Sequence, residues 1–400
     1  MAFEITARDP GSRARAGVLR TAHGDIHTPA FVPLATKGFV RGVAPFEVAG
    51  LGYEMVLGNT FHLWLAPGHA LVAQLGGLHG FMGWSGPIIS DSGGFQVFSM
   101  GHGTVADEIK GRAPSGAVRA GAVLAVDEHG VRFRSYLDGT EHELTPELAM
   151  EIQAALGSDI ALVLDECTPF HIAREETDRS TERTHRWLDR CLRWHADHRP
   201  STQLVYGIVQ GGVYEDLRRA STSAVAATGC DGIAIGGSLG RDKEQMHEVV
   251  GWATAELDRE HDERPRHLLG IGEIDDLIAG VQLGIDTFDC AMPTRLGRHG
   301  MALVPDPEAR WRVNLQGARW RESTEPIMAG CPCPACGAGH TRGWLRHLLH
   351  QAEPLAGRLL TLHNLAFVSR VMEDLRSGIA AGRLQEVAQA LQAGASPGGL

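Results

Sequence analysis

Short apolar runs recur along the first three quarters of the chain, and most of them end in glycine or polar residues. Each run has the length of one strand buried on both faces. The runs are Phe31–Thr36, Tyr53–Thr60, Pro87–Gly94, Asp159–Glu166, Gln203–Gly212, Gly232–Gly237, His267–Gly272 and Asp286–Arg295. This pattern predicts eight strands.

Stretches with helical character separate many of these runs. The expected helices are Thr145–Leu156, Glu176–His198, Tyr214–Ala227, Lys243–Arg259 and Ile274–Leu283. Strands that alternate with helices predict a parallel sheet covered by helices, and eight such units predict an α/β protein with a (β/α)8 TIM barrel. A doubly wound open sheet is the structural alternative, although no Gly-x-Gly-x-x-Gly follows the first run to indicate a dinucleotide site.

Polar residues and glycines stand at the ends of the predicted strands. The ends carry Asn59-Thr60, Asp91-Ser92-Gly93-Gly94, Asp165-Glu166, Gln210-Gly211-Gly212, Gly236-Gly237, Gly270-Ile271-Gly272 and Asp289. Glycine and aspartate are common in ordinary turns. In a barrel, however, the carboxyl ends of the strands carry the chemistry, so this repeated pattern favours an active site on one rim.

The segment Gly101–Gly130 departs from the strand–helix alternation, because it is rich in glycine, alanine and charged residues. We expect a surface insertion after the third strand, either a β-hairpin or a loop. The rest of residues 1–400 is expected to form one catalytic domain.

Three of the seven cysteines lie within six residues, in Cys331-Pro332-Cys333-Pro334-Ala335-Cys336. Thiolates at this spacing favour one tetrahedral zinc ion over free thiols. A closed site, which would be structural, needs a fourth ligand. The spacing does not choose among the nearby candidates His340, His347, His350 and His363.

The formal net charge of −11 argues against a nucleic-acid partner, because such proteins usually carry a basic surface. That surface can be local, however, and arginines cluster between Arg295 and Arg358. A solvated protein face is the ordinary interpretation of this cluster. No apolar run has the length of a transmembrane helix, and the first residues do not resemble a signal peptide. We therefore expect a cytoplasmic protein with no membrane partner.

Four longer motifs stand in order along the chain, and a fifth follows the cysteine cluster. They are Asp91–Gln96, Asp165–Pro169, Gly207–Gly212, Phe288–Arg298 and Leu362–Phe367. The set resembles the bacterial type of the tRNA-guanine transglycosylases, or queuine tRNA-ribosyltransferases, over about residues 30–370. The resemblance implies a (β/α)8 barrel with a zinc-binding subdomain, at about residues 305–365, before the last barrel helix.

The resemblance implies that the wobble guanine of GUN-anticodon tRNAs (for aspartate, asparagine, histidine and tyrosine) is exchanged for a 7-deazaguanine base in queuosine biosynthesis. That base is the aminomethyl-deazaguanine precursor or queuine. Asp289 would attack the ribose and form a covalent intermediate, and Asp91 would act as general acid and base. Such a double displacement suits a carboxylate nucleophile, because the anomeric carbon has oxocarbenium character.

The resemblance also assigns binding residues. The base would be bound by Asp91, Ser92, Gly93, Gly94, Phe95, Asp165, Gln210, Gly237 and Leu269. The tRNA anticodon loop would be bound by Gly270, Ile271, Gly272, Glu273, Ile274, Asp275, Asp276, Thr294, Arg295, Leu296, Gly297 and Arg298. One structural Zn²⁺ per chain would be held by Cys331, Cys333, Cys336 and His363, and a homodimer would form through the zinc region.

Two departures from the family pattern affect binding. Glu273 places an acid where a lysine or a neutral residue is frequent, and Gly240 stands where members that use the aminomethyl base have a bulkier residue. Gly240 predicts a roomy pocket, while Asp242 is able to meet a cationic amine.

Two other functions are alternatives: a non-catalytic subunit that docks tRNA, and a small-molecule hydrolase or lyase. The docking subunit should lack Asp289 or Asp91, and both are present.

Overall fold

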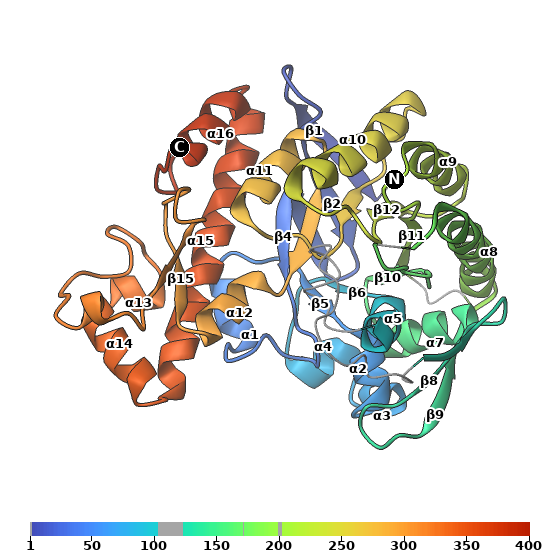
Figure 1. Cartoon of the computed structure of the whole chain (residues 1–400), viewed down its shortest axis with the longest axis horizontal. Helices are drawn as coiled ribbons and strands as arrows, with labels where there is room; N and C mark the ends of the chain where they lie inside the picture. The colour runs from blue at the N-terminus through green and yellow to red at the C-terminus, as the bar shows by residue number, and fades with distance from the viewer. Residues whose placement is uncertain (1, 103–122, 171, 199–201) are drawn as a thin grey trace.

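The computed structural model describes residues 2–102, 123–170, 172–198 and 202–400, and its centre is a ring of parallel strands (Figure 1). The eight strands are β4 (Ala30–Pro33), β5 (Val56–Gly58), β6 (Ile88–Ser90), β10 (Ile160–Leu162), β11 (Leu204–Val209), β12 (Gly232–Ile235), β13 (Arg266–Leu268) and β14 (Thr287–Cys290). Neighbours in the sheet are neighbours in the chain, β14 pairs with β4, and a parallel bridge between Leu34 and Leu57 joins β4 to β5. The predicted barrel is confirmed. The doubly wound alternative is wrong, because the strand order never reverses.

Helices cover the outside of the ring. They are α1 (Pro45–Gly50), α2 (Thr60–Leu65), α3 (His69–Gln74), α4 (Gly77–Met82), α5 (Gly94–His102), α7 (Pro146–Leu156), α8 (Arg174–His198), α9 (Glu215–Ala226), α10 (Lys243–Arg259), α11 (Ile274–Gln282), α12 (Met292–Arg298), α15 (Pro354–Ala380) and α16 (Leu384–Gln392). The five predicted helices are all present. The predicted cap of α7 is also present, because the Thr145 side chain accepts a hydrogen bond from Leu148 N. Within the described ranges, no helix is long and apolar enough to cross a membrane.

Two three-stranded antiparallel sheets lie outside the barrel in the described part of the chain. The first contains β1 (Phe3–Arg8), β2 (Arg15–Thr21) and β3 (Gly24–Thr28), which the sequence analysis did not predict. The second contains β7 (Val123–Val126), β8 (Val131–Arg134) and β9 (Glu141–Leu144).

The second sheet corrects the extent of the predicted insertion at Gly101–Gly130. Residues 101–102 end helix α5, and the antiparallel sheet continues past residue 130 to Leu144. A β-hairpin is therefore present at the end of the predicted segment. Residues 103–122 of the predicted insertion lie outside the described part of the chain.

A separate lobe lies between α12 and the long helix α15, beside the barrel (Figure 1). It contains β15 (Met301–Leu303), β16 (Arg312–Asn314), a 3-10 turn at Ala318–Trp320, α13 (Pro334–Gly337) and α14 (Arg342–His350). The α12 and α15 helices are in close contact, because a Cβ at Gly297 would lie only 2.6 Å from Thr361 N.

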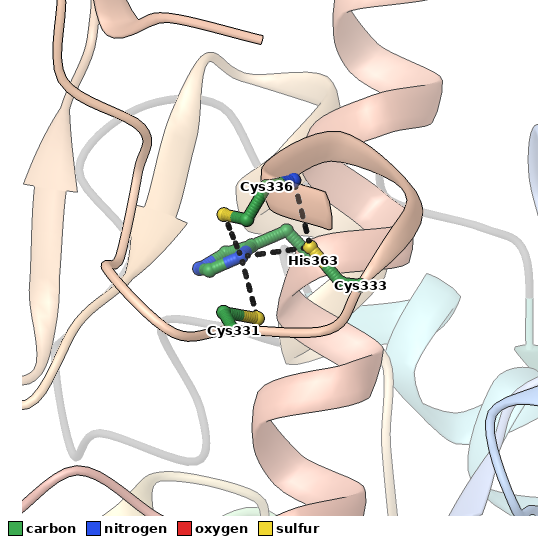
Figure 2. A group of neighbouring side chains, drawn as sticks. All are labelled: Cys331, Cys333, Cys336 and His363. Atoms are coloured by element: carbon green, nitrogen blue, oxygen red, sulfur yellow. Dashed lines mark hydrogen bonds between the residues drawn. The ribbon is translucent and has the colours of Figure 1, made fainter. Parts of the chain in front are cut away.

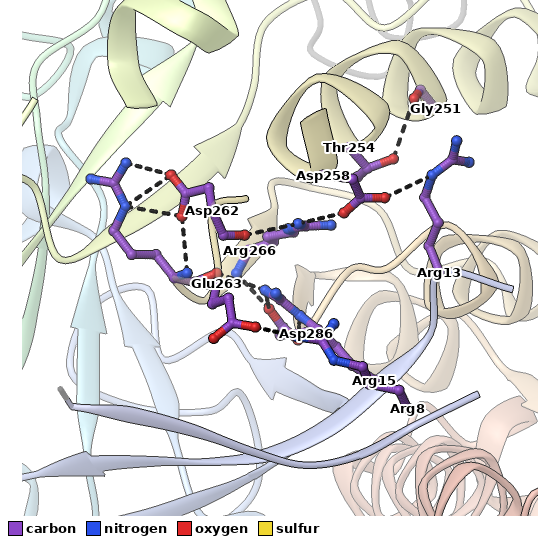
Figure 3. Close-up of polar contacts among 11 residues, drawn as sticks. Arg8, Arg13, Arg15, Gly251, Thr254, Asp258, Asp262, Glu263, Arg266 and Asp286 are labelled. Atoms are coloured by element: carbon purple, nitrogen blue, oxygen red, sulfur yellow. Dashed lines mark hydrogen bonds and ion pairs between the residues drawn. The ribbon is translucent and has the colours of Figure 1, made fainter. Parts of the chain in front are cut away.

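A buried ion pair joins the first small sheet to the amino-terminal ends of β13 and β14 (Figure 3). Arg15 Nη2 and Nε donate to the two carboxylate oxygens of Asp286 at 2.6 and 2.9 Å, and both side chains are at most 1% exposed. Asp286 Oδ2 also accepts a hydrogen bond from Arg266 N at 2.6 Å. This end of the barrel therefore has a structural role.

Replacing Asp286 should destabilise the fold strongly. In Asp286→Asn the Arg15 charge stays buried without its partner, which should lower the free energy of unfolding by about 3–5 kcal/mol in urea titrations. The control is Glu263→Gln, which breaks the exposed pair with Arg8 and should change that free energy by less than about 1 kcal/mol. Equal losses in the two variants would contradict a structural role specific to the buried pair.

Candidate functional site

Four of the polar residues predicted for the rim lie at the carboxyl ends of barrel strands. Asp91 directly follows β6, Asp165 lies just beyond β10, Gln210 directly follows β11, and Asp289 is within β14. Because the strands are parallel in a closed ring, these ends share one face of the barrel. The contacts described below bring the four side chains into two neighbouring groups.

Asp289 is 7% exposed and is held through one of its oxygens. Its Oδ1 accepts a hydrogen bond from Gly270 N at 3.0 Å and lies 3.2 Å from His267 Nε2. The Nδ1 of the fully buried His267 lies 2.8 Å from the Thr287 hydroxyl. When that hydroxyl donates to Nδ1, His267 carries its proton on Nε2 and donates it to Asp289. Within the described residues Oδ2 accepts no hydrogen bond, so one carboxylate oxygen is left for chemistry.

Asp91 lies close enough to Asp289 for the two charges to interact. Burial raises the pKa of Asp91, the hydrogen bond from Thr60 N at 2.8 Å opposes that shift, and the negative charge of Asp289 adds to it, so that the resulting pKa is about 7. Asn59 Nδ2 donates to the other Asp91 oxygen. A carboxyl with a pKa near neutrality is able both to give and to take a proton at physiological pH.

Asp165 and Gln210 form the second group. Gln210 Nε2 donates to Asp165 Oδ2 at 2.6 Å, and the Ser92 hydroxyl donates to Asp165 Oδ1 at 3.1 Å. Burial raises the pKa of Asp165 to about 6. Gly237 lies against this group, because a Cβ there would collide with Gln210 Oε1. The result is a small hydrogen-bonding wall that mixes donors and acceptors.

The remaining residues predicted for the base lie around that wall. A Cβ at Gly94 would lie 2.7 Å from Asp165 O, and Gly93 has a positive φ of 82°. Phe95 is half-buried in the first turn of α5. Leu269 is half-buried, and its Cδ1 would lie 3.0 Å from a Cβ at Gly236.

Gly240 and Asp242 have local structural roles. Gly240 has a φ of +122°, and its Cβ would lie 2.9 Å from Gln245 Cγ. A side chain at position 240 would therefore point toward Gln245. Asp242 caps helix α10, accepting from Gln245 N at 2.9 Å. These contacts do not support a pocket widened by Gly240.

The acidic residues of the segment Gly270–Asp276 pair within the protein. Glu273 forms an ion pair with Arg312 on β16, and Asp275 accepts a hydrogen bond from Trp311 Nε1 at 2.6 Å. Lys243 Nζ lies 3.3 Å from carboxylate oxygens of both Asp275 and Asp276. The unexpected acid at position 273 therefore has a cationic partner.

Ile271, Gly272 and Ile274 of the same segment pack against the barrel. Ile271 and Ile274 are buried, and a Cβ at Gly272 would lie 2.5 Å from Cys290 Cβ. Gly270 is exposed at the end of β13.

The short helix α12 presents two arginines to solvent. Thr294, Leu296 and Gly297 are buried, whereas Arg295 and Arg298 are exposed and form no ion pair within the described residues. Burial lowers the pKa of Arg298, and the charges of Arg41 and Arg295 lower it further. The three guanidinium groups are therefore neighbours.

Lys37 lies near the same cationic group, because Lys37 and Arg41 both lower the pKa of His62, after burial as the main cause. We call Lys37, Arg41, Arg295 and Arg298 the cationic rim. Lys37 and Arg41 were not predicted from the sequence, because they are isolated charges in an otherwise uncharged stretch. Other late arginines bond internally: Arg342 donates to Pro326 O, and Arg346 donates to Gly317 O.

The three clustered cysteines meet His363 of helix α15 (Figure 2). The thiol sulfurs of Cys331, Cys333 and Cys336 lie 3.8, 3.4 and 3.5 Å from His363 Nδ1, and all four residues are buried. Tetrahedral zinc, with bonds of about 2.3 Å to sulfur and 2.0 Å to nitrogen, places such atoms about 3.5 Å apart. The cluster is therefore able to hold a metal ion.

The surroundings of His363 fit a metal ligand. The ring nitrogen that faces away from the cysteines, Nε2, lies 2.8 Å from Leu303 O. Donation to that carbonyl keeps the proton on Nε2 and leaves the Nδ1 lone pair free to bind the ion. Of the four histidines considered from the sequence, His363 is the one in the cluster.

A second group of possible ligands lies at the opposite end of the barrel from the rim. His23 Nδ1 and His79 Nε2 lie 2.8 and 3.4 Å from different oxygens of Asp159. The two imidazole rings are stacked with centroids 3.6 Å apart and an 18° interplanar angle. A metal ion binds in the plane of an imidazole ring and cannot lie in both of these planes. These contacts therefore fit hydrogen bonds to Asp159 better than a metal site.

Comparison with known proteins gives matches over nearly the whole chain. The model of the family described as queuine tRNA-ribosyltransferase matches residues 9–396. A queuine tRNA-ribosyltransferase of Roseiflexus sp. (strain RS-1) is 50% identical over 392 residues, which cover 96% of this chain and 97% of that protein. One from Dictyoglomus turgidum is 42% identical over 387 residues, which cover 96% and 92%.

Removing one ligand should remove the metal. We expect the wild-type protein to bind one ion per chain, measured by elemental analysis, and Cys336→Ser to lose that ion and to melt at a lower temperature. When a metal ion is present at 1,000 times its Kd, the loss of its binding lowers the free energy of unfolding by about 4 kcal/mol. The matched control is Cys191→Ser, which changes a buried thiol outside the cluster and should keep the ion. Full metal content in Cys336→Ser would rule out this ligand set.

Proposed function

Because the chain belongs to the queuine tRNA-ribosyltransferase family, we propose that its rim exchanges the wobble guanine of GUN-anticodon tRNAs for a 7-deazaguanine base in queuosine biosynthesis. The observation that carries this proposal is the pair of interacting carboxylates, Asp289 with a free oxygen and Asp91 with a pKa raised to about 7. The docking-subunit alternative should lack one of them.

In the first half of the proposed reaction, Asp289 Oδ2 attacks the ribose C1′ of the wobble nucleotide. The bond from C1′ to the base breaks as the ester bond to Asp289 forms, and the departing guanine takes the proton of Asp91. His267 and Gly270 hold Oδ1 during the attack. A covalent route splits one difficult displacement into two easier ones.

In the second half, the Asp91 carboxylate accepts the proton of the incoming base. The base nitrogen then attacks C1′ and releases the Asp289 carboxylate. The two half-reactions need opposite protonation states of Asp91, which a pKa near 7 makes accessible at the same pH. The enzyme returns to its starting state without an oxidant or reductant.

Base recognition is assigned to the wall around Asp165. A guanine-like edge combines a carbonyl acceptor with N–H donors, which Gln210 and the Gly237 backbone on one side, and Asp165 on the other, are able to match. Phe95 is the proposed stacking partner, and Leu269 is proposed to lie on the opposite face. The incoming base is the aminomethyl precursor or queuine.

RNA recognition is assigned to the cationic rim and to the Gly270–Asp276 segment. The exposed, unpaired Arg295 and Arg298 are proposed to contact the nucleotides beside the wobble position. Lys37 and Arg41 add positive charge for phosphates. Ion pairs such as Glu273–Arg312 reduce the repulsion between this acidic segment and the RNA phosphates.

We propose that the metal is one structural Zn²⁺ bound by Cys331, Cys333, Cys336 and His363. Four protein ligands leave no open position for substrate. The next residue along α15, Asn364, donates to Pro293 O and Met301 O at 3.0 Å each. The ion would therefore stabilise the helix that supports α12 and its arginines.

The proposed assembly is a homodimer near the metal-binding lobe. Exposed aromatic side chains lie on nearby segments: Phe46 of α1 is 76% exposed, and Phe39 is 48% exposed. The neighbouring residue Glu47 pairs with Arg358 of α15, so α1 lies beside the helix that carries His363. Contiguous exposed apolar patches mark association surfaces, and these two phenylalanines are proposed to belong to one. The cytoplasm is the proposed compartment, because the tRNA substrate is there.

The test of the function is a covalent enzyme–tRNA adduct that survives denaturation, together with incorporation of labelled guanine into tRNA. We expect Asp289→Asn to form no adduct and to slow guanine exchange by roughly 10³-fold or more, as for loss of other covalent nucleophiles. The matched control is Asp216→Asn, a change to an exposed carboxylate paired with Arg174, which should leave both unchanged. An adduct with Asp289→Asn would show that another residue is the nucleophile, and no exchange by the wild-type protein would end the proposal.

Adduct formation should depend on pH through Asp91. A pKa raised to about 7 means that the proton-donating form is present below pH 7 and is lost as the pH rises. The rate constant of adduct formation, measured by rapid quench, should therefore fall about tenfold per pH unit above about pH 7. In Asp91→Asn the residual rate should be slow and should lack this decline. A wild-type rate that stays constant up to pH 9 would contradict the acid role.

A further inference from the structure

Arg218 of helix α9 is completely buried beneath the loops that end strands β11 and β12. Its guanidinium donates to the backbone oxygens of Gly212, Val209, Gly236 and Ser238 at 2.8, 3.0, 2.9 and 2.9 Å. Within the described residues it forms no ion pair with a carboxylate. Four carbonyl dipoles from two separate loops therefore surround one positive charge.

A buried arginine without a carboxylate partner is unusual, since burying an isolated charge is costly. By contrast, the equally buried Arg15 is paired with the carboxylate of Asp286. Burial lowers the pKa of Arg218 to about 9, so the side chain stays protonated at neutral pH. Its charge is therefore available to act on the loops above it.

The four carbonyl groups bracket the proposed base-binding residues. Val209 and Gly212 stand on either side of Gln210 and Gly211, and Gly236 and Ser238 stand on either side of Gly237. Gly211 has a φ of +123°, and a Cβ there would lie 2.7 Å from Arg218 N. The first of these loops therefore rests directly on α9, and the same guanidinium fixes the position of the second loop relative to it.

The direction of one peptide group follows from these bonds. The Gly236 carbonyl points at Arg218, and in a planar trans peptide the following N–H, of Gly237, points the opposite way. Within the described residues this N–H donates to no acceptor. A positive charge bonded to the carbonyl oxygen polarises the peptide and makes its N–H a stronger donor.

We propose that Arg218 is a positioning residue that aims the Gly237 N–H at a carbonyl oxygen of the base and strengthens that hydrogen bond. The inference rests on the proposed function of the same site. The hydrogen bond from Gly237 N–H would make the site selective for purine-like bases that carry a carbonyl on the bound edge. The same donor stabilises negative charge that develops on a departing base.

The test is equilibrium binding of two free bases, guanine and 2-aminopurine, which lacks the carbonyl oxygen. It is done by calorimetry on the wild-type protein, Arg218→Lys and Arg218→Gln. Arg218→Lys keeps the charge but loses the fork of donors, and Arg218→Gln loses the charge. We expect the wild type to prefer guanine by tenfold or more. Each folded variant should lose about tenfold of its guanine affinity, while its affinity for 2-aminopurine changes less than twofold.

The matched control is Arg15→Lys, a change to an equally buried arginine at the other end of the barrel. It should lower the melting temperature and leave the preference for guanine unchanged. A merely structural Arg218 would behave like this control, and that result would overturn the inference. A wild-type protein that binds both bases equally would overturn it without any variant. A wild-type protein that binds neither base and exchanges no guanine into tRNA would instead end the proposed function.

Discussion

The parallel pairing of β14 between β13 and β4 is the constraint on which the site depends. This register sets Asp289 opposite Val32 of β4 and beside the strand that carries His267 and leads to Gly270. Three residues earlier in the chain, Asp286 is held by Arg15 at the other end of the barrel. One strand thus has a structural carboxylate at its start and the proposed nucleophile near its end. This division agrees with the general separation of stability and chemistry between the two faces of such barrels.

The metal cluster is connected to the rim through helix packing. His363 faces the cysteines, and the adjacent Asn364 bonds to the backbone of Pro293 at the start of α12. Further along α12, the absence of a side chain at Gly297 lets the helix approach the backbone of Thr361. The lobe also reaches the barrel directly, because Arg312 of β16 pairs with Glu273. The cluster is therefore joined to both segments proposed to contact RNA.

Much of this architecture was predictable from the sequence, because strands buried on both faces read as continuous apolar runs and their polar ends read as a rim. The first small sheet was missed because its strands alternate buried and exposed positions, as in β1, and so lack the continuous apolar run that marks a barrel strand. Arg218 and His267 were missed for a different reason. Arg218 precedes the partly exposed Arg219 in an amphipathic helix, and only the three-dimensional packing distinguishes the buried residue from the one near solvent. The spacing of the cysteines did not show which of four nearby histidines is the fourth ligand. The folded position of α15 brings His363 to the sulfur atoms.

The cationic rim has a consequence for how a polyanion approaches. The whole chain carries a formal charge of −11, whereas Lys37, Arg41, Arg295 and Arg298 form no ion pairs within the described residues. An RNA molecule at a distance is therefore repelled by the body of the protein and attracted at one face. Such an electric field disfavours encounters in which the RNA approaches any other face of the protein. The effect weakens as added salt shortens the range of charge interactions. If RNA binds at the cationic rim as proposed, the negative net charge of the protein favours the correct orientation of its partner.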